Sequence, residues 1–301
     1  MREILLLVTI VLGQLAPNGH LLTQMTNNLR VNPQATTQKA ASNNIDAIIA
    51  GPTKTGVEDY TASAGAVYSI DLDSDETLTS KNTDKQLQIA SLTKLMTAYI
   101  ILKEEKDLDR VVPVTSLNPQ VGDSTMGLVI GDKMTIRGLL DGLLIPSGSD
   151  AAETLAIANG GSVAAFVAKM NTTAKDLNLT NTHFANPVGW DDTANYSTAK
   201  DLTELTRILL RNETFTEIVQ TKTKTVTTVG GRALPLATTN QLLYNSGFSG
   251  VKTGYTFGAG ECLISLYKDG KTEILTTVIG SGARFSETES IKGWIITHFS
   301  W

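Results

Sequence analysis

One stretch of the chain restricts its fold more than any other, because it is apolar on nearly every face and still contains a lysine. Between residues 92 and 102 the polar side chains are only Thr93, Lys94, Thr97 and Tyr99. A helix that is apolar all round belongs in the middle of a core. The pattern therefore predicts a buried helix over residues 92–102, with the Lys94 amine enclosed.

Ser91 precedes that lysine by three residues. In a helix the two side chains are neighbours, with Cβ atoms about 5–6 Å apart, and a helix beginning at Ser91 also brings unsatisfied N–H groups to the hydroxyl. A neutral amine at pH 7 requires its pKa to fall by roughly three from ~10.4, about 4 kcal/mol, which burial and a second cation can supply. The pair is typical of an activated serine nucleophile with a lysine base.

Three other Ser-x-x-Lys matches occur, and each has a structural explanation. Thr198 followed by Asp201 predicts a helix cap at the Ser197/Lys200 match. The Ser249/Lys252 and Ser265/Lys268 matches fall in strand-like segments, where residues three apart point to opposite faces. Ser91 alone has a buried helical setting.

Composition limits the class of protein. The chain has 301 residues, 41% hydrophobic and 18% charged, which is typical of a globular protein with a sizeable core. Its net charge of −5 gives no general attraction for nucleic acid. One cysteine, Cys262, cannot form an internal disulfide, and the histidines and Cys262 show no zinc spacing. We expect no metal and no cofactor.

The N-terminus indicates export. Met1-Arg2-Glu3 precedes a nearly all-apolar run of nine residues, 4–12, which fits a secretory signal and is shorter than the ~20 residues of a spanning helix. We predict a signal peptide or N-terminal anchor over 1–22, a flexible linker over 23–61 and a catalytic domain over 62–301. The location is then the periplasm, the outer face of the cytoplasmic membrane or the medium. Membrane attachment would occur only through an uncleaved N-terminus.

The order of predicted elements indicates an α+β fold. A strand over 64–70 with a partner over 76–78 precedes the Ser91 helix, and helices follow Thr135, Ser147-Gly148-Ser149, Ser162 and Thr198. The chain then becomes β-rich over 221–229, 232–236 and 250–254. A hairpin over 261–268 and 272–279 and a helix over 285–299 complete it. We expect an antiparallel sheet flanked by helices, with an adjoining helical cluster.

Two further motifs are candidates for the same site. On a strand, Lys252 and Gly254 of Lys252-Thr253-Gly254 share one face, and the glycine lets a substrate backbone approach closely. Such a strand suits a peptide carboxylate and an oxyanion. A second Lys-Thr-Gly, at residues 54–56, lies in linker-like sequence with no strand after it.

Ser147-Gly148-Ser149 lies at a break between two apolar helices. A loop held on both sides by core helices presents hydroxyls rigidly, and helix capping is the alternative role for Ser147 and Ser149. Ser116-Leu117-Asn118 competes for the same role, but Pro119 and the polar residues around it indicate an ordinary loop.

Together these motifs resemble the serine-type D-Ala-D-Ala carboxypeptidases, the low-molecular-mass penicillin-binding proteins. The resemblance rests on residues 89–98, 143–152 and 250–256, which contain the three motifs, and on a central loop over 181–190 and 196–198. It extends from about Ala64 to the C-terminus, and it implies the transpeptidase fold shared by DD-peptidases and β-lactamases.

The resemblance also implies the role of each residue. Ser91 would attack the carbonyl between two terminal D-alanines of a peptidoglycan stem peptide, Lys94 would take its proton, and Ser147 would relay a proton to the departing D-alanine. Substrate would be bound by Ser149, Lys252, Thr253, Gly254 and Tyr255. Lys252 would hold positive charge and keep Lys94 neutral, Thr253 would bind the terminal carboxylate, and the N–H groups of Ser91 and Tyr255 would hold the oxyanion. β-Lactam antibiotics would be covalent inhibitors.

Two departures from the family pattern have consequences. Ser149 stands where the family usually has Asn, whose longer amide reaches substrate and lysine, so we expect Ser149→Asn to alter deacylation or substrate preference. Many members also add a β-rich C-terminal domain, and here we expect none after the last helix.

Several alternatives stay open at this level. DD-transpeptidases and DD-endopeptidases share the motifs. A non-catalytic penicillin-binding sensor is less favoured, because the reactive residues Ser91, Lys94, Ser147 and Lys252 are all intact. A class A β-lactamase would need Glu-x-x-Leu-Asn, which is absent. A Ser/His/Asp hydrolase is disfavoured because no Gly-x-Ser-x-Gly occurs, and His183 is equally explained as a loop histidine.

Overall fold

The structure of the protein is a computed structural model, and it describes residues 51–118 and 124–301. The predicted signal peptide or anchor over 1–22 and most of the predicted linker over 23–61 lie outside these residues. The predicted catalytic domain, 62–301, is described except for residues 119–123.

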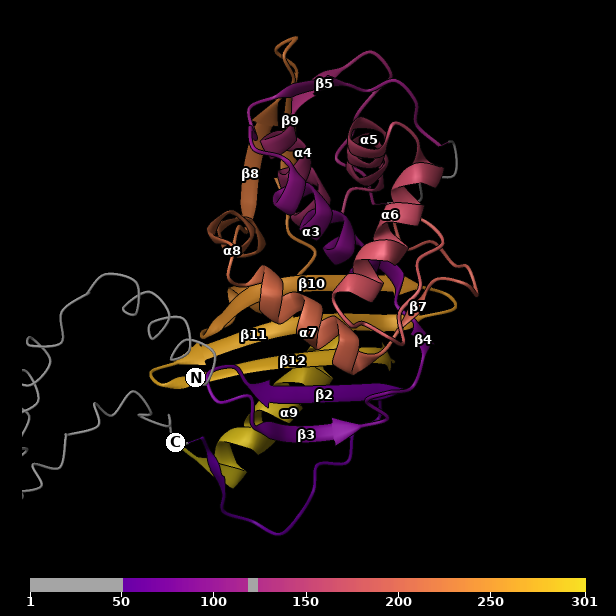
Figure 1. Cartoon of the computed structure of the whole chain (residues 1–301). Helices are drawn as coiled ribbons and strands as arrows, with labels where there is room; N and C mark the ends of the chain where they lie inside the picture. Colours follow the sequence, from indigo (N-terminus) through magenta and orange to yellow (C-terminus); the bar gives the residue numbers. More distant parts are fainter. Residues whose placement is uncertain (1–50, 119–123) are drawn as a thin grey trace, which may run out of the picture. The chain divides into compact units, whose positions relative to one another are not determined.

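A five-stranded antiparallel sheet forms the base of the catalytic domain (Figure 1). Its strands follow the order β10-β11-β12-β2-β3, so the first and last parts of the domain share one sheet. β11 and β12 form the predicted hairpin, in which Asp269 pairs with Thr272. The strands are β2 (Ala66–Asp71), β3 (Thr77–Lys81), β10 (Phe248–Thr256), β11 (Gly260–Asp269) and β12 (Thr272–Ser281).

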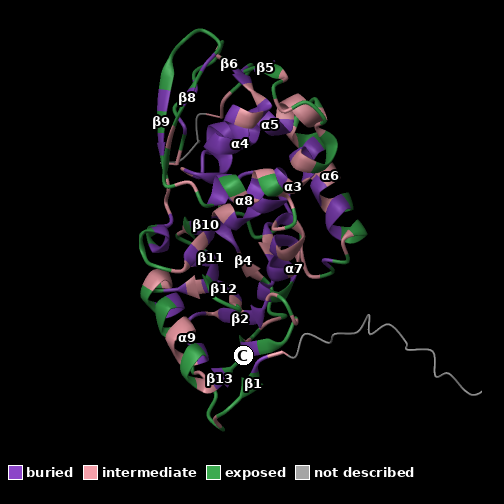
Figure 2. Ribbon diagram, turned by 90° about the vertical axis from the view of Figure 1, so that its left-hand side faces the viewer, coloured by how far each residue is buried: buried purple, intermediate pink, exposed green. Residues whose placement is uncertain are grey.

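Helices cover both faces of this sheet (Figure 2). Leu263 and Tyr267 of β11 belong to the core under α9 (Arg284–His298), whereas Ile264 and Leu266 belong to the core under α7 (Ala199–Leu209). Successive side chains of a strand point to opposite faces, so one strand supplies two cores. This explains why the middle of β11 is buried without the alternation of a half-exposed strand.

The second layer is a helical cluster that adjoins the sheet (Figure 1). Three of the observed side-chain caps are those that the sequence predicts, because Thr135, Ser162 and Thr198 accept hydrogen bonds from the N–H groups of Gly138, Ala165 and Asp201. The Asn212 cap of the helix over 213–219 was not predicted. The helices are α3 (Lys94–Glu104), α4 (Ile136–Leu144), α5 (Ser149–Gly160), α6 (Val163–Asp176) and α8 (Glu213–Val219). The predicted α+β fold is confirmed.

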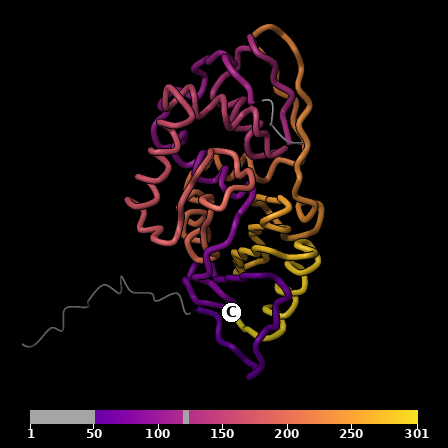
Figure 3. The backbone as a smooth tube through the Cα atoms, turned by 90° about the vertical axis from the view of Figure 1, so that its right-hand side faces the viewer, coloured from indigo at the N-terminus to yellow at the C-terminus, as the bar shows by residue number. Residues whose placement is uncertain are grey.

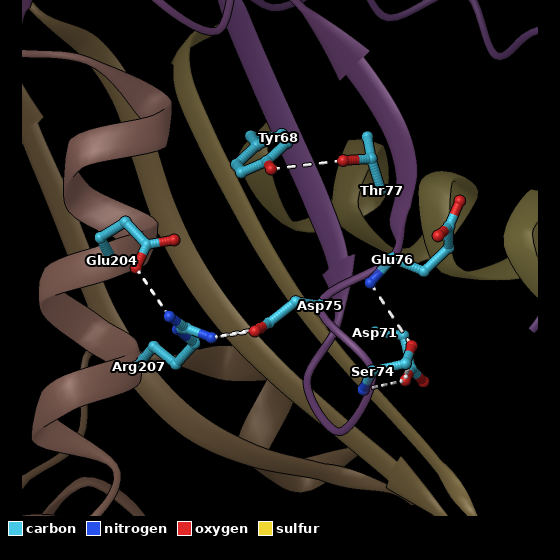
Figure 4. Close-up of polar contacts among 8 residues, drawn as sticks. All are labelled: Tyr68, Asp71, Ser74, Asp75, Glu76, Thr77, Glu204 and Arg207. Carbon is cyan, nitrogen blue, oxygen red and sulfur yellow. Dashed lines mark hydrogen bonds and ion pairs between the residues drawn. The ribbon is translucent and has the colours of Figure 1, made fainter. Parts of the chain in front are cut away.

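Polar contacts connect α7 to the edge of the sheet (Figure 4). Arg207 contacts the carboxylate of Asp75, in the turn between β2 and β3, and lies 3.1 Å from Glu204 Oε2. Asp75 is exposed, and ion pairs of this kind contribute about 0–1 kcal/mol. These contacts orient the helix, whereas its buried leucines hold it on the sheet.

Short strand pairs surround these layers. β8 (Thr223–Thr227) and β9 (Ala233–Ala237) form a hairpin beside the helical cluster, drawn in orange in Figure 3, and β5 (Val111–Pro113) pairs with β6 (Lys133–Thr135). Val229 N donates to Lys133 O at 2.9 Å and joins the two pairs. The remaining short elements are β4 (Leu87–Gln88) with β7 (Tyr196–Ser197), and the 3₁₀ turns η2 (Ala90–Thr93) and η3 (Gln241–Tyr244).

The start of the domain differs from the prediction. β1 (Thr53–Lys54) pairs with β13 (Phe299–Ser300), so ordered structure begins ahead of the predicted boundary at residue 62. The Lys-Thr-Gly at residues 54–56 therefore begins with the last residue of this strand, rather than lying in a linker. The pairing partner lies at the other end of the chain, where local sequence patterns give no sign of it.

Within the described part of the chain, no single helix has both the length and the apolar character to cross a membrane. α5 and α6 satisfy the two criteria only together, and the chain bends by 85° between them.

Candidate active site

Ser91 lies in the 3₁₀ turn η2, and the α-helix proper begins at Lys94. The α-helix therefore begins about one turn later than its predicted start at Ser91. The outcome for the chemistry is favourable, because side chains three residues apart are eclipsed in a 3₁₀ turn. Ser91 Oγ and Lys94 Nζ are 2.8 Å apart.

The Lys94 side chain has no exposed surface, which confirms that it is enclosed. Besides Ser91, its Nζ donates to the Val188 carbonyl at 2.9 Å. Burial lowers the pKa of Lys94 to about 7, against the opposing effect of the Asp150 carboxylate. A large fraction of the amine is therefore neutral near pH 7 and able to take a proton from a hydroxyl 2.8 Å away.

Two glycines allow the backbone around Ser91 to pack closely. A Cβ on Gly189, where φ is +98°, would lie 1.9 Å from Ala90 O, and a Cβ on Gly254 would lie 3.1 Å from Ser91 N. We expected Gly254 to leave room for substrate, but its missing side chain makes room for η2 itself. Ala90 has a φ of +48°, a conformation that costs a non-glycine residue about 1–3 kcal/mol.

The loop between α4 and α5 presents Ser147, the side chain of which accepts a hydrogen bond from Lys252 Nζ at 2.7 Å. Ser147 also has a positive φ, +65°. Asp150 anchors the start of α5, because its carboxylate accepts hydrogen bonds from the N–H groups of Met126, Gly127 and Leu128. The loop is thereby held on both sides, as its position between two core helices predicts.

β10 forms the opposite wall. Lys252 is 1% exposed and donates to Ser147 Oγ and, at 2.8 Å, to Thr253 O. Burial, and then the nearby charges of Lys94 and Arg284, lower the pKa of Lys252 well below 10.5. The role of Lys252 as a positive charge in the pocket stays a prediction. The two buried amines disfavour each other's protonated form, which supports a neutral Lys94.

These elements enclose a pocket of about 210 Å³. Hollows of about 270 and 400 Å³ lie beside β3 and beside the β8–β9 hairpin, so the chemistry of its lining, rather than volume, distinguishes this pocket. The lining residues are Ser91, Ser124, Ser147, Thr239, Thr253, Gly254, Tyr255 and Arg284.

Most predicted site residues meet here. Five of them line the pocket, and Lys94 and Lys252 lie buried beside two lining hydroxyls. Ser149 is the exception, since it is absent from the lining and its N–H donates to Ser124 O at 2.8 Å. The catalytic and binding roles of these residues stay predictions.

Three lining residues were missed from the sequence. Ser124 and Thr239 lie in polar loops without a distinguishing pattern, although Thr239 Oγ1 is 2.5 Å from Thr253 Oγ1. Arg284 is the first residue of α9 and donates to Gly254 O at 3.1 Å, while its Nε finds no hydrogen-bond partner among the described residues. Its signal was a cation at a helix N-terminus, where the helix dipole disfavours positive charge.

His183 does not take part in this arrangement. Its Nδ1 lies 2.6 Å from Ala194 O and its ring stacks on Tyr196, so it is a structural residue of the 183–196 loop. Among the described residues, no group of three or more His, Cys, Asp and Glu side chains is placed to hold a metal ion.

Comparison with known proteins agrees with this geometry. Residues 53–283 match the family model described as D-alanyl-D-alanine carboxypeptidase. The chain is 38% identical to the D-alanyl-D-alanine carboxypeptidase of Streptomyces sp. (strain K15) over 79% of this chain and 88% of that protein. It is 34% identical to D-alanyl-D-alanine carboxypeptidase DacF of Bacillus subtilis over 72% of this chain but only 57% of that longer relative.

The fold is also that of a solved relative. The crystal structure of the Streptomyces K15 DD-transpeptidase superimposes with a TM-score of 0.74 at 35% identity, covering 80% of this chain and all of that one. The family match, these identities and the Ser91–Lys94 pair in its pocket lead to one conclusion. The chain belongs to the D-alanyl-D-alanine carboxypeptidase family of serine peptidases.

Proposed function

We propose that this protein removes the terminal D-alanine from peptidoglycan stem peptides through an acyl-enzyme on Ser91, and that β-lactams block it by acylating the same residue. Family membership supports the substrate class. The observation that carries the mechanism is the 2.8 Å contact between Ser91 Oγ and Lys94 Nζ at a lysine with no exposed surface.

Acylation follows from this contact. Neutral Lys94 takes the proton of Ser91, and the resulting alkoxide attacks the carbonyl carbon of the bond between the two D-alanines. The carbonyl oxygen becomes an oxyanion, for which the N–H groups of Ser91 and Tyr255 are the proposed donors. The close packing of Gly254 against Ser91 N supports this, because it brings β10 beside η2. Such donors are typically worth about 3–4 kcal/mol each.

The part of the pocket lined by Thr253, Thr239 and Arg284 suits the terminal carboxylate. Thr253 and Thr239 present two hydroxyls there, and Arg284 adds a guanidinium with an unpaired Nε. Charge-assisted hydrogen bonds from arginine to a carboxylate are strong. An arriving carboxylate also favours the ammonium form of Lys252, whose pKa burial lowers in the free protein.

Ser147 is the proposed route for the leaving group's proton. The collapsing intermediate breaks the C–N bond, and the departing D-alanine nitrogen needs one proton. Ser147 lines the pocket and accepts from Lys252 at 2.7 Å, so it can pass a proton to that nitrogen and regain one from the amine behind it. Water then attacks the ester and gives its proton through Ser147 to the Lys252 amine, and the Lys94 ammonium returns its proton to Ser91 Oγ as the shortened peptide leaves. An amine acceptor in place of water would make the reaction a transpeptidation.

Mass spectrometry of the products separates these outcomes. The protein is incubated with a stem pentapeptide, with and without an amine acceptor. Release of one D-alanine and gain of water is the expected result, whereas a product joined to the acceptor indicates the DD-transpeptidase alternative. Cleavage of a cross-linked dimer would indicate the DD-endopeptidase alternative.

Covalent labelling tests the nucleophile. A fluorescent penicillin should label the wild-type protein and not Ser91→Ala. Ser249→Ala is the matched control, because it removes the serine of another Ser-x-x-Lys match whose hydroxyl has no hydrogen-bond partner among the described residues. Labelling of Ser91→Ala at the wild-type rate would refute the mechanism.

We also propose that the protein acts outside the cytoplasmic membrane, where peptidoglycan lies. The apolar run over residues 4–12 after Arg2 supports export. A fusion of residues 1–61 to a reporter that is active only after export tests this, and a reporter active only in the cytoplasm would contradict it.

A further inference from the structure

A large exposed aromatic side chain follows closely after the segment of β10 that lines the pocket. Phe257 is 96% exposed and lies in the turn between β10 and β11, two residues after Tyr255, which lines the pocket and is itself 62% exposed. Isolated apolar side chains are common on protein surfaces, but here two exposed aromatic side chains occur within three residues of one another, one of them in the pocket lining, and we call these two rings the ledge.

The turn that presents Phe257 is fixed in place. Gly258 N donates to Asp191 Oδ2 at 3.0 Å, and Ala259 N donates to Thr256 Oγ1 at 3.1 Å. A Cβ on Gly258 would lie 2.1 Å from Gln88 Oε1, so the turn rests directly on its neighbours. Asp191 is exposed, and it brings a carboxylate to the turn that carries the ring. We call Tyr255, Phe257 and Asp191 the rim.

The direction of a bound peptide places its acyl part over the rim. Thr253, a proposed carboxylate contact, and Tyr255, whose N–H is a proposed oxyanion donor, follow each other along β10, and Gly254 between them packs against the turn that carries Ser91. From the scissile carbonyl at Ser91, the acyl chain therefore continues outward along β10, past Tyr255 and toward Phe257.

We propose that the rim binds the side-chain ammonium of the diamino acid that precedes the penultimate D-alanine. This inference rests on the proposed function and adds a determinant of substrate choice to it. An aromatic face attracts a cation through its quadrupole, a carboxylate attracts it by charge, and the methylenes of a diamino acid suit the ledge. A neutral side chain of similar length would gain only the contact between its methylenes and the ledge.

The dimensions agree with this placement. Phe257 follows Tyr255 by two residues, so their Cα atoms are at most about 7 Å apart. The diamino acid Cα lies one residue, ~3.8 Å, from the Cα of the acyl residue, and each bond of its side chain adds up to about 1.5 Å. An ammonium on a four-carbon stem therefore reaches the Phe257 turn, whereas alanine at that position does not.

The test compares two acyl donors that differ only at one nitrogen. One peptide carries lysine before D-Ala-D-Ala and the other carries Nε-acetyl-lysine, and D-alanine release gives kcat/KM for each. We expect the wild-type protein to favour the free amine by roughly 3- to 30-fold, the range of an exposed cation–π contact combined with an exposed ion pair. The preference should fall as salt is added.

Two variants separate the contributions. Phe257→Ala removes the ring, and Asp191→Asn removes the charge while its amide oxygen can still accept from Gly258 N. Phe257→Ala should reduce the preference by about 2- to 5-fold and Asp191→Asn by about 1.4- to 5-fold, and each should lower kcat/KM for the acetylated donor less than for the free amine. Tyr244→Ala and Asp109→Asn remove an exposed ring and an exposed charge outside the pocket lining, and both should retain the preference.

The outcomes are distinct. Equal kcat/KM values for the two donors, or a preference that survives in both Phe257→Ala and Asp191→Asn, would refute the proposal that the rim binds the ammonium. Either result would leave the proposed function in place. Equal losses on both donors in these variants would indicate a structural role and would also refute the proposal about the rim. Release of D-alanine from neither donor would overturn the proposed function, and the rim with it.

Discussion

Titration of Lys94 is the sharpest test of the proposed chemistry, because the structure gives both the direction and the size of the effect. Burial lowers the pKa of this amine to about 7 from 10.5. At pH 7 roughly half of it is then neutral, against about 1 in 3,000 for an unperturbed lysine. The second-order rate constant for acylation by a fluorescent penicillin should therefore rise about tenfold per pH unit below 7 and level off above it.

The same pKa difference has a consequence for stability. Between about pH 7 and 10.5 the unfolded chain binds a proton at Lys94 that the folded chain does not, so stability rises with pH across this window. Below pH 7 the full cost of burying the ammonium applies. The difference of 3.5 between 10.5 and about 7 corresponds to about 5 kcal/mol.

The variant Lys94→Met isolates the free-energy cost of burying the Lys94 ammonium. The variant loses catalysis and the hydrogen bond to Val188 O, and an unsatisfied buried carbonyl costs about 1–3 kcal/mol. We therefore expect Lys94→Met to be about 2–4 kcal/mol more stable than wild type at pH 7 and less stable above pH 10. Denaturant unfolding monitored by circular dichroism at several pH values measures this.

The control is Lys200→Met, at the exposed lysine of another Ser-x-x-Lys match, which should change neither the acylation profile nor its pH dependence. An acylation profile that keeps rising to pH 9 would refute the argument that burial sets the base. A stability difference between wild type and Lys94→Met that is constant from pH 6 to 10 would refute it independently.

Four other substitutions give directional results. Gly254→Ala places a Cβ 3.1 Å from Ser91 N and should slow penicillin acylation at least tenfold without unfolding the protein. Arg284→Gln should raise KM for D-Ala-D-Ala peptides more than it lowers kcat, as steady-state D-alanine release would show. Ser149→Asn should change deacylation or substrate preference, and an unchanged kinetic profile would exclude a role for Ser149. Glu287→Gln should destabilise the protein by about 1–3 kcal/mol in denaturant unfolding. Although burial alone would raise the pKa of Glu287, hydrogen bonds hold it below 4.5, so the stability it contributes is lost as pH falls below that value and the variant should lose this dependence.

The parts of the fold that sequence predicted are those set by local patterns. Apolar periodicity and cap residues gave the helices after Thr135, Ser162 and Thr198, and the buried lysine in α3 gave the position of the reactive centre. The pairing of β1 with β13 could not be predicted, because it joins residues nearly 250 positions apart through backbone groups that every residue has.

The same distinction holds in the pocket. Ser91, Ser147 and Lys252 belong to motifs whose spacing has a chemical meaning. Thr239 lies beside Thr253 only because the chain folds back after β9, and Arg284 reaches Gly254 only because α9 starts at the end of the sheet. Such residues reach the pocket because of how the chain folds over long range. The sequence indicates them only where they depart from a local preference, as Arg284 does by placing a positive charge at a helix N-terminus.

Several departures from ordinary folding preferences meet at this pocket. A lysine lies in an apolar helix, a second lysine is buried beside it, and Ala90 and Ser147 are non-glycine residues with positive φ. Each feature costs stability by itself, through desolvation or backbone strain. Selection for stability alone would remove such costs one by one. Their occurrence around a pocket of about 210 Å³ is best explained if the arrangement is maintained for catalysis, which is why Lys94→Met should gain stability as it loses activity.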